Sequence, residues 1–166
     1  SEGRPETPDL HMFRATAYKV KRDYYSALRS FDAGLKISDA KALNATFHFN
    51  KGIVYKAQED FERAIKEFDE TLSLAPNLIH ALQFRGQSYS DIGKFERAIE
   101  DFDECLKLNS QFGEVYVDRG IAYYQKGDRE KALKDYNKAI DLNRNLKWAY
   151  YQRGFTYSSM GRLDDA

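Results

Sequence analysis

The sequence lacks most of the features that mark disulfide-bonded, membrane-spanning or exported proteins. The chain of 166 residues has one cysteine, Cys105, and three prolines. A single cysteine forms no internal disulfide, so an oxidising compartment is not required. No apolar run reaches the ~20 residues of a membrane span, and the N-terminal residues lack the apolar core of a signal peptide. These absences favour a cytoplasmic protein without membrane insertion, and the scarcity of proline is compatible with helices throughout.

The chain also has no formal net charge at neutral pH. The 26 basic and 26 acidic residues cancel, and the two signs are finely mixed along the chain. A nucleic-acid-binding domain usually carries a basic stripe, and a membrane-surface protein usually carries a polybasic segment. We therefore expect no nucleic acid among the partners of this chain.

A period of 34 residues dominates most of the sequence. Four glycines recur at this spacing, each after a basic residue and three residues before a tyrosine. A glycine inside a helix costs roughly 1 kcal/mol relative to alanine, so we expect these glycines to permit close packing of two helices. In three repeats a further glycine follows seven residues later, where a positive φ can end one helix and let the next begin. The first set is Gly52, Gly86, Gly120 and Gly154, and the second is Gly93, Gly127 and Gly161.

The spacing continues with an alanine and an aromatic residue, as in Ala98 and Phe102. From about residue 45 to residue 166 the sequence resembles the tetratricopeptide repeat, a helix–turn–helix unit with the pattern W-x2-L-G-x2-Y…A-x3-F…P. The chain departs from this pattern at the leucine position, which is basic in each repeat, and keeps the terminal proline only as Pro76. The resemblance implies an all-α fold, a right-handed superhelical solenoid of antiparallel helix pairs with about four repeats and a truncated fifth.

The register of the repeat sets the predicted boundaries along the chain. The first helix of the truncated last repeat lacks a complete partner helix. We therefore expect either further repeats beyond Ala166 or another molecule that covers this helix. The predicted segments are residues 1–7 (a disordered segment or a cloning remnant), 8–44 (a divergent first repeat with a longer loop), 45–78, 79–112 and 113–146 (full repeats), and 147–166 (a first helix and the start of a second).

The basic residue before each glycine has two interpretations. In three repeats an acid follows sixteen residues later, so an ion pair between helices is one interpretation. The alternative is a basic row that recognises an acidic ligand, although the acids would neutralise much of such a row. The candidate pairs are Lys51 with Glu67, Arg85 with Asp101, and Arg119 with Asp135.

No catalytic constellation is evident. The three histidines are widely spaced, and none has a histidine or cysteine neighbour at metal-ligand spacing. Cys105 occupies the position that Thr71 and Ala139 hold in adjacent repeats, so we interpret it as a small buried thiol rather than a nucleophile. No glycine-rich phosphate-binding loop follows a strand, because no strand is evident. We expect no metal, no cofactor and no enzyme activity in this chain.

The resemblance also implies a binding surface, because the first helices of such arrays line an extended concave groove. We expect this groove to bind a partner protein or peptide through aromatic anchors and through amides that hydrogen-bond a peptide backbone. The implied groove residues are Phe49, Asn50, Ile53 and Lys56; His80, Gln83, Phe84 and Gln87; Glu114, Val117, Asp118 and Ile121; and Trp148, Tyr151, Gln152 and Phe155.

One subclass of the family grips the acidic tails of heat-shock chaperones with Lys, Asn and Arg on three first helices. Asn50 matches one of these positions, but later basic positions hold His80 and Phe84 in one repeat and Glu114 and Asp118 in the next. We therefore predict a protein–protein interaction scaffold that is not a clamp for chaperone tails. The alternatives are a recognition or regulatory arm of a larger enzyme, or a structural module that self-associates through its open terminal repeat.

Overall fold

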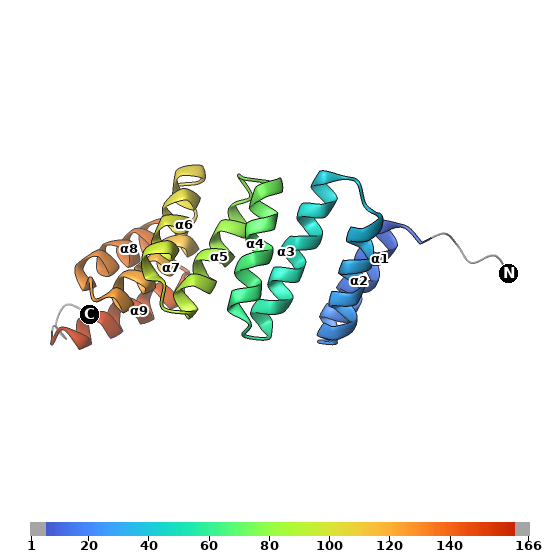
Figure 1. Cartoon of the computed structure of the whole chain (residues 1–166). Coiled ribbons are helices and arrows are strands. Elements are labelled where there is room, and N and C mark those ends of the chain that lie inside the picture. Colours follow the sequence, from blue (N-terminus) through green and yellow to red (C-terminus); the bar gives the residue numbers. More distant parts are fainter. Residues whose placement is uncertain (1–5, 162–166) are drawn as a thin grey trace. The chain divides into compact units, whose positions relative to one another are not determined.

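The computed structural model describes residues 6–161, and all regular elements in this range are α-helices (Figure 1). The chain divides into two compact units, unit 1 (residues 1–81) and unit 2 (residues 82–166), and α5 spans the division. No helix in the described part is long and apolar enough to cross a membrane. The helices are α1 (Pro8–Val20), α2 (Tyr24–Ile37), α3 (Lys41–Ala57), α4 (Phe61–Leu74), α5 (Ile79–Asp91), α6 (Phe95–Leu108), α7 (Gly113–Lys126), α8 (Arg129–Leu142) and α9 (Lys147–Ser159).

Unit 1 contains two pairs of antiparallel helices. α1 packs against α2, α3 packs against α4, and α2 contacts α3 (Figure 1). Small residues lie where the helices approach closely, and large rings fill the space between them. Ala15 and Ala27 are fully buried, while Phe31 meets Phe47 edge to face with ring centroids 6.2 Å apart. The divergent first repeat is therefore a helix pair that shares its packed core with α3.

Unit 2 continues the same architecture. α7 contacts α6, α8 and α9, and α8 also packs against α9. Its core combines small and large apolar residues that recur at helical spacing, which is why one face of each helix is buried. This core contains Val117, Ala132, Tyr136, Ala139, Ile140 and Ala149. The predicted all-α fold of repeated helix pairs is confirmed.

The repeat glycines make room for an aromatic ring. A Cβ atom at Gly86 would lie 2.7 Å from Cε1 of Phe102, and one at Gly120 would lie 2.5 Å from Cε1 of Tyr136. Gly52 stands in the same relation to the ring of Phe68. The expectation of close packing is confirmed, but the group that requires it is the ring sixteen residues later rather than the alanine of the partner helix.

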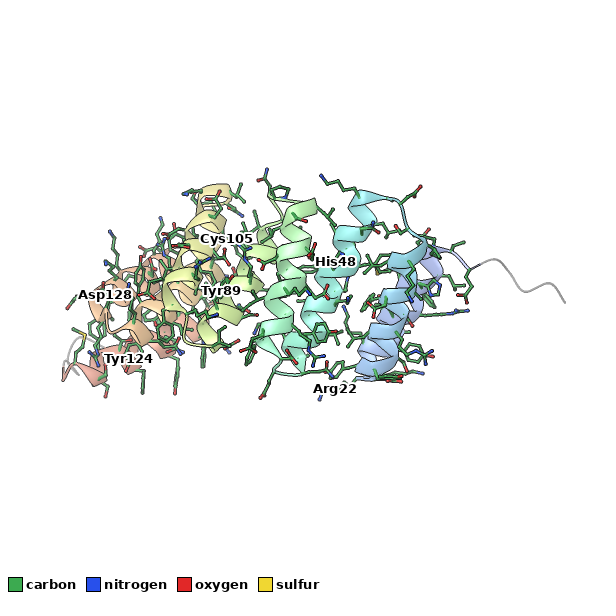
Figure 2. The ribbon with its side chains drawn as sticks, viewed as in Figure 1. Arg22, His48, Tyr89, Cys105, Tyr124 and Asp128 are labelled. Atoms are coloured by element: carbon green, nitrogen blue, oxygen red, sulfur yellow. The ribbon has the colours of Figure 1, made fainter. Side chains whose placement is uncertain are left out.

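The predicted turn glycines, which follow the first helices, adopt the expected backbone conformation. Gly93, Gly127 and Gly161 have φ values of 74°, 98° and 71°, in the left-handed region that glycine adopts without a Cβ penalty. Arg22, at the turn between α1 and α2 (Figure 2), and Glu59 take φ values of 60° and 59° at the corresponding place. In two turns a residue other than glycine therefore adopts the left-handed backbone conformation.

Three second helices begin at an aspartate that caps them. The side chain of Asp128 accepts a hydrogen bond from the backbone N–H of Lys131, and Asp23 and Asp60 cap α2 and α4 in the same way. Such caps satisfy one of the four N–H groups that have no partner within the helix. α6 begins instead at Lys94, which provides no side-chain cap.

The N-terminal part differs from the prediction in two details. α3 begins at Lys41, so the residues assigned to a longer loop form an extra helical turn, and Leu43 in that turn packs against the core of unit 1. Thr7, assigned to a disordered segment, caps α1 by accepting a hydrogen bond from the N–H of Leu10 at 3.2 Å. The rest of that segment up to residue 5, and the predicted start of a second helix at residues 162–166, lie outside the described residues.

Candidate functional site

A row of ion pairs links the helices of unit 1. Lys51 Nζ lies 2.7 Å from Glu67 Oε1 on α4 and 2.9 Å from Asp32 Oδ1 on α2. His48 Nδ1 lies 2.8 Å from the other oxygen of Glu67. Burial opposes ionisation of Glu67, but its hydrogen bonds with His48 and Lys51 outweigh burial and lower the pKa of its carboxyl. One buried cation therefore connects three helices.

The same arrangement recurs in unit 2. Arg85 donates two hydrogen bonds to Asp101, at 2.9 and 2.6 Å. Arg119 donates two to Asp135, both at 2.8 Å, and a third to Asp103 at 2.5 Å. Burial alone would lower the pKa of Arg119, but Asp135 and Asp103 outweigh it and raise that pKa. The ion-pair interpretation is confirmed for Lys51, Arg85 and Arg119.

Several contacts of this network were not predicted from the sequence. Asp103 lies sixteen residues before Arg119, just as Asp135 lies sixteen residues after it. The same backward spacing joins Arg153 to Asn137, whose side-chain oxygen accepts a hydrogen bond at 3.0 Å. A search in both directions from each basic residue would have found these partners. The basic residues are thus largely occupied within the protein.

Cys105 is fully buried. Burial raises the pKa of its thiol to about 12, with smaller contributions from the negative charges of Asp101 and Asp118. A thiol with such a pKa is not ionised near neutral pH, and the thiolate is the reactive form. The interpretation as a small buried thiol is confirmed. Within residues 6–161, no group of three His, Cys, Asp or Glu side chains is placed to hold a metal ion.

The predicted groove residues of unit 1 are largely engaged with their neighbours. The ring of Phe49 lies 6.0 Å from that of Phe68, and Lys56 Nζ lies 5.8 Å from the ring of Phe61. Asn50 Oδ1 accepts a hydrogen bond of 2.6 Å from Lys19. Ile53 is half-buried on α3, and His80 is exposed on α5. These residues do not form a set of exposed anchors.

In unit 2 the predicted groove residues of α5 and α7 meet at one carboxylate. Gln83 and Gln87 both donate hydrogen bonds to Oδ2 of Asp118, at 2.8 and 2.9 Å. Gln83 is buried, while Gln87 and Phe84 are half-buried. The side-chain amides of Gln83 and Gln87 on α5 therefore hold the carboxylate of Asp118 on α7 in a fixed position.

The other predicted residues of α7 divide by exposure. Val117 is 4% exposed and belongs to the core of unit 2, so it offers no surface to a ligand. Ile121 is half-buried against the same core. Glu114 is exposed and makes no ion pair within the described part of the chain. Only Glu114 and Asp118 of this predicted group therefore contribute polar surface.

The most distinctive surface of unit 2 is a row of four rings, which we call the aromatic row. Trp148 stacks on Tyr151 with centroids 5.0 Å apart and planes 12° apart, and Tyr151 is nearly parallel to Phe155 at 6.5 Å. Tyr124 of α7 (Figure 2) continues the row, 5.6 Å from Phe155. The exposed fractions are 56% for Trp148, 60% for Tyr151 and 51% for Phe155. Gln152 is half-buried on the same helix.

Tyr124 was not among the predicted groove residues. It lies three residues after Ile121 on α7, so the helical spacing that selected Glu114, Val117, Asp118 and Ile121 reaches it when extended by one step. Its contact with Phe155 shows that the exposed faces of α7 and α9 form one surface.

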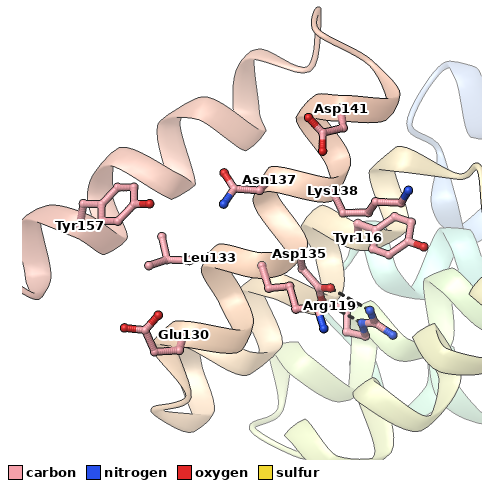
Figure 3. A pocket seen from close by; sticks show the side chains of 10 residues that line it. Tyr116, Arg119, Glu130, Leu133, Asp135, Asn137, Lys138, Asp141 and Tyr157 are labelled. Carbon is pink, nitrogen blue, oxygen red and sulfur yellow. Dashed lines mark hydrogen bonds and ion pairs between the residues drawn. The ribbon is translucent and has the colours of Figure 1, made fainter. Parts of the chain in front are cut away.

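A separate hollow of about 670 Å³ lies over α8 (Figure 3). Its charged groups alternate in sign along α8, and the Arg119–Asp135 ion pair lies at its edge (Figure 3). Arg119 and Asp135 satisfy each other there, so neither offers a free charge to a ligand. The lining residues are Tyr116, Arg119, Glu130, Leu133, Lys134, Asp135, Asn137, Lys138, Asp141 and Tyr157.

Solved structures of known proteins resemble this chain along most of its length. A crystal structure of the MamA protein has a TM-score of 0.85 and 24% identity, and the match covers 96% of this chain and 86% of that one. YrrB, described as a TPR protein with an unusual peptide-binding site, has a TM-score of 0.78 and 22% identity over 87% and 73% of the two chains. The first TPR of Spaghetti (RPAP3), bound to the HSP90 peptide SRMEEVD, has a TM-score of 0.69 and 23% identity over 72% and 95%.

The sequence itself matches family descriptions in three places. Residues 45–78 and 79–112 each match a family described as tetratricopeptide repeat, and residues 120–161 match one described as TPR repeat. No curated protein matches the sequence. The three matches together cover more than half of the chain, in agreement with the helix pairs and the spacing of their glycines and rings. The chain belongs to the tetratricopeptide repeat family.

Proposed function

We propose that the chain is a protein-interaction module that binds a segment of a partner protein on the aromatic row of unit 2. The observation that carries this proposal is the exposure of Trp148, Tyr151 and Phe155, three large rings stacked on one helix face. Exposed apolar surface of this kind often marks an interaction site. Tryptophan and tyrosine are also enriched among the residues that dominate binding energy.

The stacked arrangement supports binding of an extended segment rather than a small molecule. The rings follow one another along α9 and onto α7, so their edges form a line rather than an enclosed pocket. Each ring is held by its neighbour, which reduces the side-chain entropy lost on binding. Gln152 lies on the same helix and offers amide donors and an acceptor to a peptide backbone.

The surface is unsuited to the acidic tail of a chaperone. Its charged groups on α7 are Glu114 and Asp118, and acids repel a terminal carboxylate. Asp118 is additionally fixed by Gln83 and Gln87, so it cannot move far from an approaching anion. RPAP3 shares the fold and binds an HSP90 peptide, but we propose a different ligand chemistry for this chain.

A random library of 12-residue peptides displayed on phage tests the proposal. Peptides selected on the wild type should bind the double variant Trp148→Ala, Tyr151→Ala at least tenfold more weakly, because two anchors are removed. The matched control is Tyr25→Ala, which removes a ring that is 71% exposed but lies outside the row. Equal binding by the double variant and the wild type would place recognition elsewhere.

Self-association is a second candidate function, favoured by the face of α9 that carries Gly154. Among the described residues, a Cβ atom at Gly154 would meet nothing within 4 Å, whereas the three preceding repeat glycines each face a ring. Nε of Arg153 is buried and has no hydrogen-bond partner among the described residues. Tyr157, three residues later on the same helix, lines the hollow over α8 (Figure 3). These features support a helix from a second copy packing there.

Sedimentation equilibrium tests this second candidate. The mass of the wild type should rise with concentration, while Gly154→Leu, which fills the open space, should stay monomeric at the same concentrations. A wild-type mass that does not depend on concentration rules out self-association through this face.

A further inference from the structure

We infer that the partner segment carries an arginine, which stacks on Trp148 and pairs with Glu114. This inference rests on the proposed function, because it specifies the ligand of the aromatic row. Three observations lead to it: the two ends of the row differ, the predicted groove residues of unit 2 include acids but no base, and the chain places its own cations over several rings other than Trp148.

The two ends of the aromatic row are chemically different. At the end formed by Tyr124, the guanidinium of Arg129 lies 5.7 Å from the ring centroid. At the other end, Trp148 stacks on Tyr151 by one face, is 56% exposed and has no cation over it within residues 6–161. The protein therefore completes the row with its own guanidinium at one end and leaves the other end open.

Elsewhere the protein repeatedly places cations over aromatic rings. Arg63 lies 4.7 Å from the ring centroid of Tyr55, and Lys131 lies 5.3 Å from that of Tyr123. Tryptophan provides the most favourable ring for such a contact. Trp148 is the single tryptophan of the chain, so the ring best suited to a cation is one that no cation in the described part of the chain covers.

The charges beside the row favour a basic ligand. The predicted groove residues of unit 2, from Gln83 to Phe155, include the acids Glu114 and Asp118 and no lysine or arginine. Lys147 directly precedes Trp148, but consecutive side chains on a helix point about 100° apart. The predicted groove residues of unit 2 therefore combine apolar rings with negative charge, and the guanidinium of Arg129 lies over the Tyr124 end of the row.

Glu114 is placed to act as the counter-ion. It is the second residue of α7, and Trp148 is the second residue of α9. α7 and α9 run in the same direction because each is antiparallel to α8, so both side chains lie at the same end of the surface. Glu114 is exposed and makes no ion pair among the described residues, which leaves its carboxylate available to a ligand.

Arginine fits this end better than lysine does. Its guanidinium is planar and stacks flat on an aromatic ring, and it can present its edge to a carboxylate at the same time. A lysine ammonium is a strongly hydrated point charge that cannot extend a stack of rings. The site therefore selects for shape as well as for charge.

The peptides selected from the 12-residue library test the inference. We expect arginine to be enriched in the selected sequences, and replacement of that arginine by glutamine to weaken binding at least fivefold, with lysine intermediate. Because Trp148 is the one tryptophan, its fluorescence should change on titration with the arginine peptide. Glu114→Gln should weaken binding of this peptide about fivefold, while Glu100→Gln, an exposed acid on α6, should leave it unchanged.

The outcomes separate this inference from the proposed function. If the library yields no peptide that depends on Trp148 and Tyr151, the proposed function fails and the inference fails with it. If it yields peptides that depend on the row but show no enrichment of arginine, or that bind Glu114→Gln as tightly as the wild type, only the inference is overturned. Circular dichroism of each variant confirms that it is folded.

Discussion

Glu59 and Arg22 adopt a backbone conformation that glycine adopts at the other turns. Both have φ near 60°, where the Cβ atom of an L-residue approaches the following carbonyl oxygen at a cost of roughly 1–2 kcal/mol. Glu59 is exposed, and its backbone N–H is held by the carbonyl of Lys56 at 3.0 Å. The geometry of the turn therefore requires a positive φ at this position, although glutamate adopts it at an energetic cost.

Replacing Glu59 by glycine should stabilise the protein. Glycine removes the Cβ strain but loses more backbone entropy on folding, so we expect a net gain of about 0.5–1 kcal/mol in the free energy of unfolding. Urea denaturation followed by circular dichroism measures it. Gly127→Ala, at a φ of 98°, should change stability in the opposite direction. A loss of stability in Glu59→Gly would mean that the glutamate side chain stabilises the turn.

At the scale of the helix, α6 lacks the cap that the other second helices share. Lys94 has φ and ψ of −88° and 63°, nearly the values of Asp128, −90° and 72°. The backbone at residue 94 is thus already arranged for a capping side chain. The sequence provides lysine there, so the first N–H groups of α6 receive no side-chain acceptor.

Lys94→Asp should therefore stabilise α6. An aspartate in this geometry can accept from the third N–H of the helix, and such caps contribute about 1 kcal/mol. Thermal unfolding should show a higher midpoint for Lys94→Asp and a lower one for Asp128→Ala, which removes an existing cap. If the two changes had the same sign, the cap geometry would not govern either helix.

The helix pairs could be predicted from the sequence because their signals are local. The glycine at position 120 and the ring at position 136 recur at one spacing, and the turn glycines mark each reversal. The candidate site was less predictable. The contact between the rings of Tyr124 and Phe155 depends on how α7 and α9 pack, and the burial of Val117 depends on the same packing. Sequence periodicity identifies the face of a helix but not which of its residues remain exposed beside a neighbouring helix.

At the scale of the whole molecule, charge is internally compensated, and the ion pairs of Glu67 make folding sensitive to acid. Glu67 is half-buried between Lys51 and His48, and its pKa is lowered on folding from an ordinary value near 4.5. Its ionised form therefore stabilises the folded chain above about pH 4.5, and this stabilisation is lost as the pH falls through the lowered pKa. Acid should accordingly weaken the protein by protonating Glu67.

A pH series of thermal unfolding tests this sensitivity. The midpoint of the wild type should fall below about pH 4.5. Glu67→Gln should be less stable than the wild type by about 1.5–3 kcal/mol at neutral pH, and its midpoint should decline less in acid because one proton-binding group is gone. Glu70→Gln, an exposed acid on the same helix, should behave like the wild type. Parallel acid curves for Glu67→Gln and the wild type would assign the sensitivity to other groups.

The ion pairs of Arg119 also bear on how such a chain can change its length. This arginine binds one acid sixteen residues ahead and another sixteen residues behind, so the repeat at residues 79–112 supplies Asp101 to its own Arg85 and Asp103 to Arg119 of the repeat that follows. Duplication or deletion of a whole 34-residue unit would recreate this joint at the new boundary. Insertion of a single residue between the two helices would separate the arginine from its acid. Recombination in steps of one repeat is therefore tolerated where smaller insertions are not, and the number of repeats can vary more freely in evolution than the length of any one of them.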